Sequence, residues 1–211
     1  MLVDLTVREF LERVASGEPV PGGGSIAALG AALAAGLAEM VAHLTLGRQD
    51  DPVLDQEMND LVDRARALRE DLTRAVDRDS EAYEKVMLAY RMPKTTDESK
   101  RLRGEAIQEA LKEAARVPLA VAETTVEILG LAGTAIKKGN KNAVTDGRAS
   151  ALMARSAVMA AIANVRINLQ AITDDRFVQK TRADTEFLEK KALAAEEVIR
   201  SAAQPLVIGG R

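Results

Sequence analysis

The sequence predicts an all-α fold, a bundle of about six helices that are long, antiparallel and partly kinked. Two features of the 211-residue composition favour it: aromatic residues make up only 2%, while Ala, Leu, Glu, Lys and Arg dominate, as in helices that pack closely through small side chains. A third is that helix start and stop signals recur along the chain, with no strand pattern longer than a few residues. The length suits a single domain covering residues 1–211.

Capping residues, glycines and prolines set the expected helix boundaries. Thr6 with Glu9 forms a capping box for the first helix, and Asp51 followed by a proline is a typical N-cap for the third. Thr95 with Glu98 predicts a capping box for the fourth. The expected helices cover roughly residues 7–17, 26–46, 52–91, 95–138, 142–172 and 175–203.

Two segments are expected to depart from regular helix. Pro118 falls inside the fourth helix, where it is expected to kink or divide the helix because proline lacks the backbone N–H. Residues 204–211 contain Pro205 and end in Gly-Gly-Arg, which is typical of a disordered tail.

Charge and residue usage exclude several functions. The formal net charge of −3 gives no basic excess for nucleic-acid binding. Without cysteine and with His43 as the single histidine, thiolate or histidine metal sites are not expected. The apolar run over residues 26–38 is shorter than the ~20 residues of a membrane span, and the N-terminus has no signal-peptide pattern. We therefore expect a cytoplasmic protein without a membrane partner, a metal or a bound cofactor.

A glycine segment, Pro21 to Ser25, is the most informative local feature. Gly22, Gly23 and Gly24 permit positive φ and close approach of the backbone to a ligand, and Ser25 is a good N-cap for the apolar helix that follows. Amides at the positive end of that helix would attract an anion or an electron-rich ring. Alone, the segment fits a flexible turn that leads into a buried helix better than a ligand site.

Other polar residues stand at conspicuous positions. Asp79 and Tyr83 are four residues apart and so share one helix face, although a helical Asp is commonly a solvated surface residue. Lys94 follows a helix stop, where it either grips a carboxylate or is an ordinary exposed lysine.

Two asparagine clusters follow later in the chain. Asn140, Asn142 and Asp146 crowd one helix start, more polar groups than a single cap requires. Asn164 and Asn168 lie one turn apart inside an apolar helix; buried amides need partners, so they bond neighbouring helix backbones or bind a polar heterocycle. His43 is expected to be a packed or partner-bonded side chain rather than a catalyst.

Taken together, these segments resemble the cyclodeaminase/cyclohydrolase family of tetrahydrofolate enzymes over most of the chain. The motifs are Pro21-Gly-Gly-Gly-Ser25 with its Ala/Gly helix, Met40 to Arg48, Asp79-x-x-Ala-Tyr83-x-x-Val86, Pro93-Lys94, Gly139-Asn-Lys-Asn-Ala143 and Asn164-Val-Arg-Ile-Asn-Leu169. Their order and spacing carry the resemblance.

The resemblance implies an all-helical and typically homodimeric enzyme, with its folate site near the subunit interface. Such enzymes hydrolyse 5,10-methenyltetrahydrofolate to the 10-formyl form, or cyclise 5-formiminotetrahydrofolate with loss of ammonia. The tetrahydrofolate substrate is the only small molecule expected. The catalytic candidates are Asp79, Lys94 and Asp146, and the substrate-binding candidates are Gly22, Gly23, Gly24, Ser25, Tyr83, Asn140, Asn142, Asn164 and Asn168.

Helix geometry sets a condition on such a site. Asp146 and Asn164 are five turns apart, roughly 27 Å along the axis, and Asp79 and Lys94 roughly 22 Å. One reacting carbon cannot touch all of them in one subunit, so Pro118 folds the chain back, an extended folate spans the distance, or an antiparallel dimer joins opposite poles. The last predicts a composite site between two protomers.

For hydrolysis, Asp146 or Asp79 would take a proton from the attacking water and stabilise the cationic methenyl group. Asn140 and Asn142 would orient the water or the pterin, and Lys94 would bind the benzoylglutamate carboxylate or polarise a nitrogen. We favour the cyclohydrolase because no transferase domain accompanies the chain. The cyclodeaminase is the alternative, and a non-catalytic folate-binding scaffold or an interaction module without a folate site is the rival from another class.

Overall fold

The computed structural model describes residues 1–48 and 50–202, without the side chains of 196, 198 and 200–202. Five long or medium helices and one short one form it, joined by three 3-10 turns at residues 2–4, 141–143 and 169–171. The helices are α1 (Val7–Val14), α2 (Gly23–His43), α3 (Pro52–Arg91), α4 (Asp97–Lys138), α5 (Val144–Asn168) and α6 (Asp175–Ala202). The all-α prediction is confirmed.

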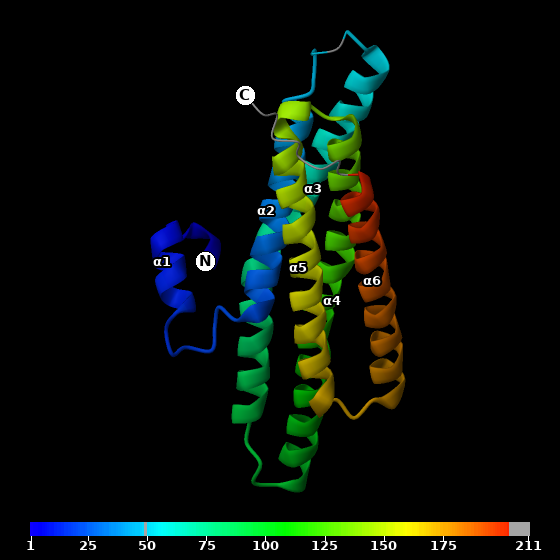
Figure 1. Ribbon diagram of the computed structural model, residues 1–211. Helices are drawn as coiled ribbons and strands as arrows, with labels where there is room; N and C mark the ends of the chain where they lie inside the picture. Colours follow the sequence, from blue (N-terminus) through cyan, green and yellow to red (C-terminus); the bar gives the residue numbers. More distant parts are fainter. Residues whose placement is uncertain (49, 203–211) are drawn as a thin grey trace.

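Helices α2 to α6 run alternately up and down in one bundle (Figure 1). Helix α2 packs mainly on α3 and α5, and α4 lies behind it against the same two helices. The core is built from alanines with a few large side chains such as Leu72, Ile128 and Ile162. Small residues let the helix axes approach closely, which explains how so few aromatics suffice.

Two of the expected caps are confirmed. Thr6 and Glu9 form the capping box of α1, and the Asp51 carboxylate accepts hydrogen bonds from the first turn of α3. The box predicted from Thr95 and Glu98 is wrong, since α4 is capped one residue later by Thr96 with Ser99.

The prediction that Ser25 is the N-cap of the second helix is also wrong. The helix begins earlier, at Gly23, with Gly22 as an N-cap that has no capping side chain. Ser25 is instead a fully buried residue of the first turns, and its hydroxyl is turned toward α3. Glycines can enter a helix when the space they leave is needed, and the site described below shows why it is needed here.

Pro118 neither divides the chain nor folds it back, because α4 continues through it from Asp97 to Lys138. Proline has no N–H to bond the carbonyl four residues earlier, which belongs to Ala114. The side-chain amide of Asn168 on α5 donates to that carbonyl at 2.7 Å. An asparagine from the neighbouring helix thus supplies the hydrogen bond that the proline removes.

The remaining boundaries deviate by a few residues. Helix α1 ends at Val14 rather than near residue 17, α2 at His43 rather than 46, and α5 is a regular helix only to Asn168. Helix α6 begins at Asp175 as expected; residue 203 and the expected disordered tail, residues 204–211, lie outside the described part of the chain.

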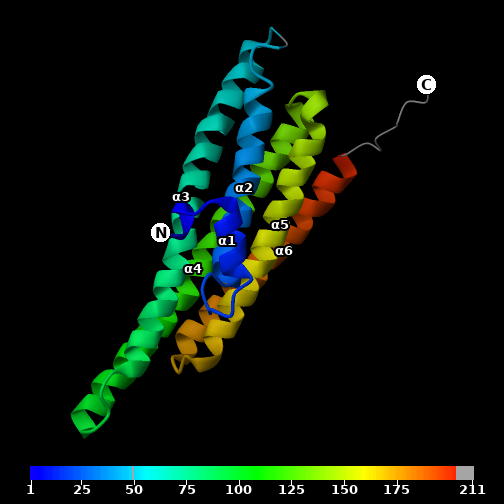
Figure 2. The same ribbon diagram turned by 90° about the vertical axis from the view of Figure 1, so that its left-hand side faces the viewer.

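The N-terminal η1 turn and α1 form an arm outside the bundle. In Figure 1 this arm stands clear of α2 at the left, and Figure 2 shows it in front of the N-terminal half of α2. The backbone N–H of Leu2 donates to the buried carboxylate of Asp77 on α3 at 2.5 Å. Phe10 is the one buried residue of α1, and Leu2 and Val3 of η1 also pack against the main core, so this hydrogen bond and three apolar side chains anchor the arm.

Three described segments are long and apolar enough to cross a membrane by length and composition alone: α2, α4 and residues 141–171. In the bundle they pack against one another, and of the apolar window in α2, 61% is buried.

Candidate active site

Three helices meet at the N-terminal end of α2. The backbone of Gly23 and Gly24 lies directly against the Asp79 carboxylate of α3 and the Asn164 amide of α5. A Cβ on Gly24 would come within 2.0 Å of Asp79 Oδ1, and a Cβ on Gly23 within 2.9 Å of Asn164 Nδ2. Beside the Asp79 carboxylate in this position only glycine fits at residue 24, whereas a side chain at residue 23 would require the Asn164 amide to shift.

Asp79 is held by the residue that follows the glycines. The Ser25 hydroxyl lies 2.9 Å from Asp79 Oδ2 and 3.0 Å from the carbonyl oxygen of Val76, and it donates to either acceptor. The hydroxyl of Ser80 is 3.3 Å from that of Ser25. Helix α2 has no N-capping side chain of its own. The Asp79 carboxylate from α3 lies against its first turn instead, where the helix dipole favours an anion.

The pKa of the Asp79 carboxyl is raised, toward the range in which a carboxyl can exchange a proton near neutral pH. Burial raises the pKa of the Asp79 carboxyl above its ordinary value, and the hydroxyl and backbone hydrogen bonds of Ser25 partly oppose that shift. Desolvation disfavours the charged form, whereas hydrogen bonds to the carboxylate favour it. A carboxyl group with a raised pKa at a helix junction is a candidate acid or base.

Asn164 and Tyr83 lie near the same helix junction. Tyr83 is one turn along α3 from Asp79 and is about one-third exposed, and Asn164 donates from Nδ2 to the carbonyl of Ala160 in its own helix. A groove of about 340 Å³ continues from the junction along α2 and α5, lined by apolar side chains including Ile26, Leu152 and Met153. The junction therefore combines a carboxyl, an amide and a phenol with an apolar groove.

Asn168, the second amide expected to contact the substrate, is already engaged within the subunit. Its Nδ2 donates to the Ala114 carbonyl freed by Pro118, so the backbone-bonding interpretation accounts for it. A substrate-binding role of Asn168 stays a prediction.

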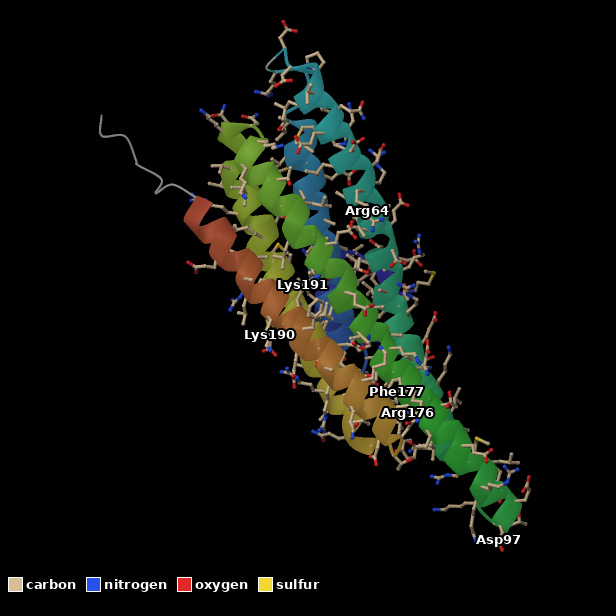
Figure 3. The ribbon with its side chains drawn as sticks, turned by 90° about the vertical axis from the view of Figure 1, so that its right-hand side faces the viewer. Arg64, Asp97, Arg176, Phe177, Lys190 and Lys191 are labelled. Carbon is tan, nitrogen blue, oxygen red and sulfur yellow. The ribbon has the colours of Figure 1, made fainter. Side chains whose placement is uncertain are left out.

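Lys94 is remote from Asp79 in the subunit. It is exposed in the loop of residues 92–96 between α3 and α4, at the tip of the hairpin where Figure 3 labels Asp97. Its suggested contact with the substrate stays a prediction.

A second polar cluster occupies the opposite pole, as the helix geometry predicted. The Asn140 side chain donates to the carbonyl of Leu44 at 3.1 Å and accepts from the Asn142 N–H at 2.9 Å. Thr45, Arg48, Asn140, Lys141 and Asn142 line a pocket of about 440 Å³ there. Asp146 lies in the first turn of α5 at the same pole.

The expectation that His43 is packed or partner-bonded is not met, because the side chain is exposed at the end of α2 and Glu39 lies beyond hydrogen-bond distance. The His43 Nε2 lies 3.8 Å from Glu39, which is buried and bonded by the guanidinium groups of Arg66 and Arg69 on α3. The arginine bonds hold the pKa of Glu39 below its ordinary value against the opposing effect of burial.

Two site residues are not predicted by the sequence patterns. Ser80 contacts Ser25, and Arg48 lines the polar pocket. Ser80 follows Asp79 directly and Arg48 ends the Met40 to Arg48 motif, so adjacency to these motifs is the one available signal.

The fold and the site define a class: an all-helical protein that holds a carboxyl with a raised pKa at a glycine-lined helix junction. The sequence comparisons specify the family. The family model described as formiminotransferase-cyclodeaminase matches residues 6–187, so the chain belongs to that family.

Individual relatives agree with the family assignment. Methenyltetrahydrofolate cyclohydrolase of Methylorubrum extorquens is 37% identical over 194 residues, covering 92% of this chain and 93% of that protein. Formimidoyltransferase-cyclodeaminase of Rattus norvegicus is 38% identical over 181 residues, 86% of this chain but 34% of that protein. The chain thus spans about a third of the length of that relative.

A solved structure has the same fold. The crystal structure of formiminotetrahydrofolate cyclodeaminase from Thermotoga maritima superposes with a TM-score of 0.86 at 29% sequence identity, over 96% of this chain and 97% of that one.

Proposed function

We propose that this chain hydrolyses 5,10-methenyltetrahydrofolate to 10-formyltetrahydrofolate. The observation that carries the proposal is the Asp79 carboxyl, held against Gly24 with a raised pKa and beside an apolar groove. The similarity to the Methylorubrum cyclohydrolase over nearly the full length of both chains supports the choice of reaction.

In this reaction the ionised Asp79 carboxylate takes a proton from water as the water oxygen bonds to the methenyl carbon. The bond from that carbon to N5 then breaks, and the protonated Asp79 returns its proton to N5. The second proton of the water leaves to solvent as the hydroxyl becomes the formyl carbonyl. The carboxylate also stabilises the cationic methenyl group before attack.

Neighbouring groups position the reactants. The Ser25 hydroxyl holds Oδ2 of Asp79, and Oδ1 lies against the backbone of Gly24, so the carboxyl is fixed in one orientation at the start of α2. Asn164 and Tyr83 are placed to contact the polar edge of the pterin, and the α2–α5 groove to take its apolar part.

Cyclodeamination is the second candidate, favoured by the Thermotoga structure, which covers the chain equally well. There N10 would bond to the formimino carbon and lose its proton to the imino nitrogen, the protonated Asp79 would supply the second proton, and the bond from the carbon to that nitrogen would break to release ammonia. A raised pKa suits this acid role too, so the two reactions use the same carboxyl in opposite protonation states.

The proposal includes the setting of the enzyme. We place it in the cytoplasm as a homodimer with the active site near the subunit interface, using no cofactor beyond the folate substrate. Asn140, Asn142 and Asp146 act in this site only if a second subunit brings their pole to Asp79.

The test is a two-substrate assay of the purified protein. Accelerated loss of the near-ultraviolet absorbance of 5,10-methenyltetrahydrofolate, measured against buffer, is the expected result. Ammonia release from 5-formiminotetrahydrofolate without such acceleration would replace hydrolysis by cyclodeamination. Saturable binding of either folate with turnover of neither would favour the non-catalytic folate-binding scaffold and contradict an enzymatic function.

A further inference from the structure

The Ser25 hydroxyl has more hydrogen-bond acceptors around it than protons to give. Its Oγ lies 2.9 Å from Asp79 Oδ2, 3.0 Å from the carbonyl oxygen of Val76 and 3.3 Å from the hydroxyl oxygen of Ser80. A serine hydroxyl carries one donor and two acceptor lone pairs, so it donates to one of these oxygens at a time. Because the distances to Asp79 and Val76 are nearly equal, another group must decide which of them receives the proton.

These groups lie where solvent cannot replace a missing partner. Ser25 is fully buried, and Val76 and Ser80 are buried beside it. In such surroundings hydrogen bonds polarise one another, and an unpaired polar group is costly. Ser25 and Ser80, which we call the serine pair, must therefore satisfy their hydroxyl groups with the protein atoms around them.

Ser80 is the neighbour of Ser25 that can donate as well as accept. The Asp79 carboxylate and the Val76 carbonyl are acceptors only, whereas either oxygen of the serine pair can be the donor in their contact. If Ser25 donated to Ser80, its proton would be lost to Asp79, and the Ser80 proton would have no other partner in the described part of the chain. Donation from Ser80 to Ser25 pairs both protons, as is the rule for buried polar groups.

We propose that Ser80 is a positioning residue of the active site: it donates to Ser25 and so frees the Ser25 proton for whichever acceptor the charge of Asp79 favours. An ionised carboxylate is a stronger acceptor than a peptide carbonyl, because its hydrogen bonds are charge-assisted. Ser25 therefore donates to Asp79 while Asp79 is ionised. Once Asp79 has taken up a proton and lost its charge, the Ser25 hydroxyl turns to the Val76 carbonyl.

This exchange requires only the rotation of one hydroxyl group. No covalent bond of the serine pair breaks, and the proton that Asp79 gains comes from the attacking water. Ser25 keeps one donated and one accepted hydrogen bond in both states. The carboxyl can thus gain and return a proton while it stays against Gly24. Groups that are already oriented before the reaction avoid the cost of reorganising during it.

The groups that shift the pKa of Asp79 are uncharged. Burial raises this pKa, and the hydroxyl and backbone hydrogen bonds of Ser25 lower it. Helix α5 brings the uncharged amide of Asn164 to the junction, and Asp77 on α3 is bonded to the backbone of Leu2. The other charged or titratable side chains that flank Asp79 on α3 are exposed: Arg78, Glu81 and Tyr83. A change in the serine pair should therefore appear directly in the pKa of Asp79.

Removal of the two serine hydroxyls should raise the pKa of Asp79 by unequal amounts. Ser25→Ala removes a hydrogen bond to a charged group, which has the larger effect. Ser80→Ala removes only the cooperative strengthening of that bond and should give a smaller rise, on the order of a third of the first. In a Ser25→Ala background, Ser80→Ala should have no further effect, because Ser80 acts through Ser25.

An NMR titration of protein labelled at the aspartate carboxyl carbons tests this without any turnover. The Asp79 signal is identified by its loss in Asp79→Asn, and its midpoint is compared among the wild type, Ser25→Ala, Ser80→Ala and the double variant. Ser80→Thr keeps a hydroxyl and should titrate as the wild type does. An unchanged or lower midpoint in Ser80→Ala, or a second shift in the double variant, would overturn the proposal.

Ser150→Ala is the matched control. Ser150 is likewise a fully buried serine between two helices, and its hydroxyl donates to the Ala34 carbonyl of α2 at 2.7 Å. Its replacement should lower the urea midpoint of unfolding but leave the Asp79 titration unchanged. A shift of the Asp79 midpoint in Ser150→Ala as large as that in Ser80→Ala would assign the effect to loosened packing and contradict the proposal.

Only the effect on catalysis rests on the proposed function. In kcat/KM profiles with 5,10-methenyltetrahydrofolate, the acidic limb of Ser80→Ala should move to higher pH together with its NMR midpoint, and Ser80→Thr should keep the limb of the wild type. A limb that does not follow the midpoint would refute the positioning role in catalysis. If the wild type turns over neither folate, the proposed function fails, and the NMR titration still decides whether the serine pair controls Asp79.

Discussion

Replacing Gly24 with alanine should damage the site more than the fold. The new Cβ would lie 2.0 Å from Asp79 Oδ1 and 2.5 Å from its Cγ, whereas an ordinary contact begins at 3.4 Å. The carboxylate must therefore retreat by about 1.4 Å or rotate away, which breaks the 2.9 Å hydrogen bond from Ser25. The methyl group cannot be accommodated in any other way while α2 stays helical.

The two consequences differ in size. Losing a hydrogen bond to a charged group costs about 1.5–3 kcal/mol, and alanine in a helix returns about 1 kcal/mol, so the free energy of unfolding should fall by only ~1 kcal/mol. A 1 Å misplacement of a catalytic group can cost about 100-fold in rate. We expect a folded protein with kcat reduced about 100-fold.

Urea unfolding and initial rates with 5,10-methenyltetrahydrofolate measure both quantities on one preparation. Gly104→Ala is the control, because Gly104 in α4 is exposed and a methyl group on its Cα would have no neighbour within 4 Å; this variant should be slightly stabilised and fully active. Wild-type kcat in Gly24→Ala would refute the reasoning that Asp79 acts from the position it occupies against α2.

Further predictions concern ionisation and packing. Burial raises the pKa of Asp79 and the Ser25 hydroxyl lowers it, so the acidic limb of the kcat/KM profile, which reports the free enzyme, should lie above the ordinary Asp range. Ser25→Ala should move this limb to higher pH; a limb that moves down or stays contradicts this. Because the pKa of Asp79 is higher in the folded than in the unfolded protein, the folded state loses stability as the pH rises from the unfolded to the folded pKa. Asp79→Asn should therefore unfold at a higher temperature than the wild type at pH 7 and show no such gain below pH ~3. Destabilisation of Asp79→Asn at pH 7 would mean that the helix dipole dominates. Asn168→Ala should lower the free energy of unfolding by about 1–3 kcal/mol, because it leaves a buried carbonyl unpaired. In a Pro118→Ala background the loss should be clearly smaller, as measured by a double-mutant cycle in urea. Equal losses in both backgrounds would refute the claim that Asn168 supplies the hydrogen bond that Pro118 cannot. Lys94→Ala should leave kcat and KM within about two-fold, since Lys94 lies at the exposed hairpin tip, and a large rise in KM would restore its contact with the substrate.

Local signals in the sequence suffice for much of the fold. Proline, glycine and capping residues act through the backbone of their own turn, so Asp51, Thr6 and Gly139 mark boundaries that the structure confirms. Pro118 misleads because its effect depends on Asn168, fifty residues away. No local pattern reveals that a distant amide replaces a missing N–H.

Part of the candidate site could likewise be predicted from local sequence patterns, and part could not. The glycines and Asp79 each stand out in the sequence, and the structure brings them into contact. The sequence does not reveal the reason for the glycines: they make room for a carboxylate from another helix and do not form a ligand-binding loop before the helix. Serine favours N-caps, but burial of Ser25 against α3 overrides that preference. The opposite-pole position of Asn140 and Asn142 follows from helix length alone.

The central claim is that Asp79 transfers the proton in methenyltetrahydrofolate hydrolysis. The most direct measurement is the rate of absorbance loss of 5,10-methenyltetrahydrofolate with wild type and with Asp79→Asn at equal concentration and pH, with circular dichroism verifying the fold of both. We predict acceleration over buffer by the wild type and a rate at least ~100-fold lower for Asp79→Asn. A folded Asp79→Asn variant that retains the wild-type rate would contradict the claim.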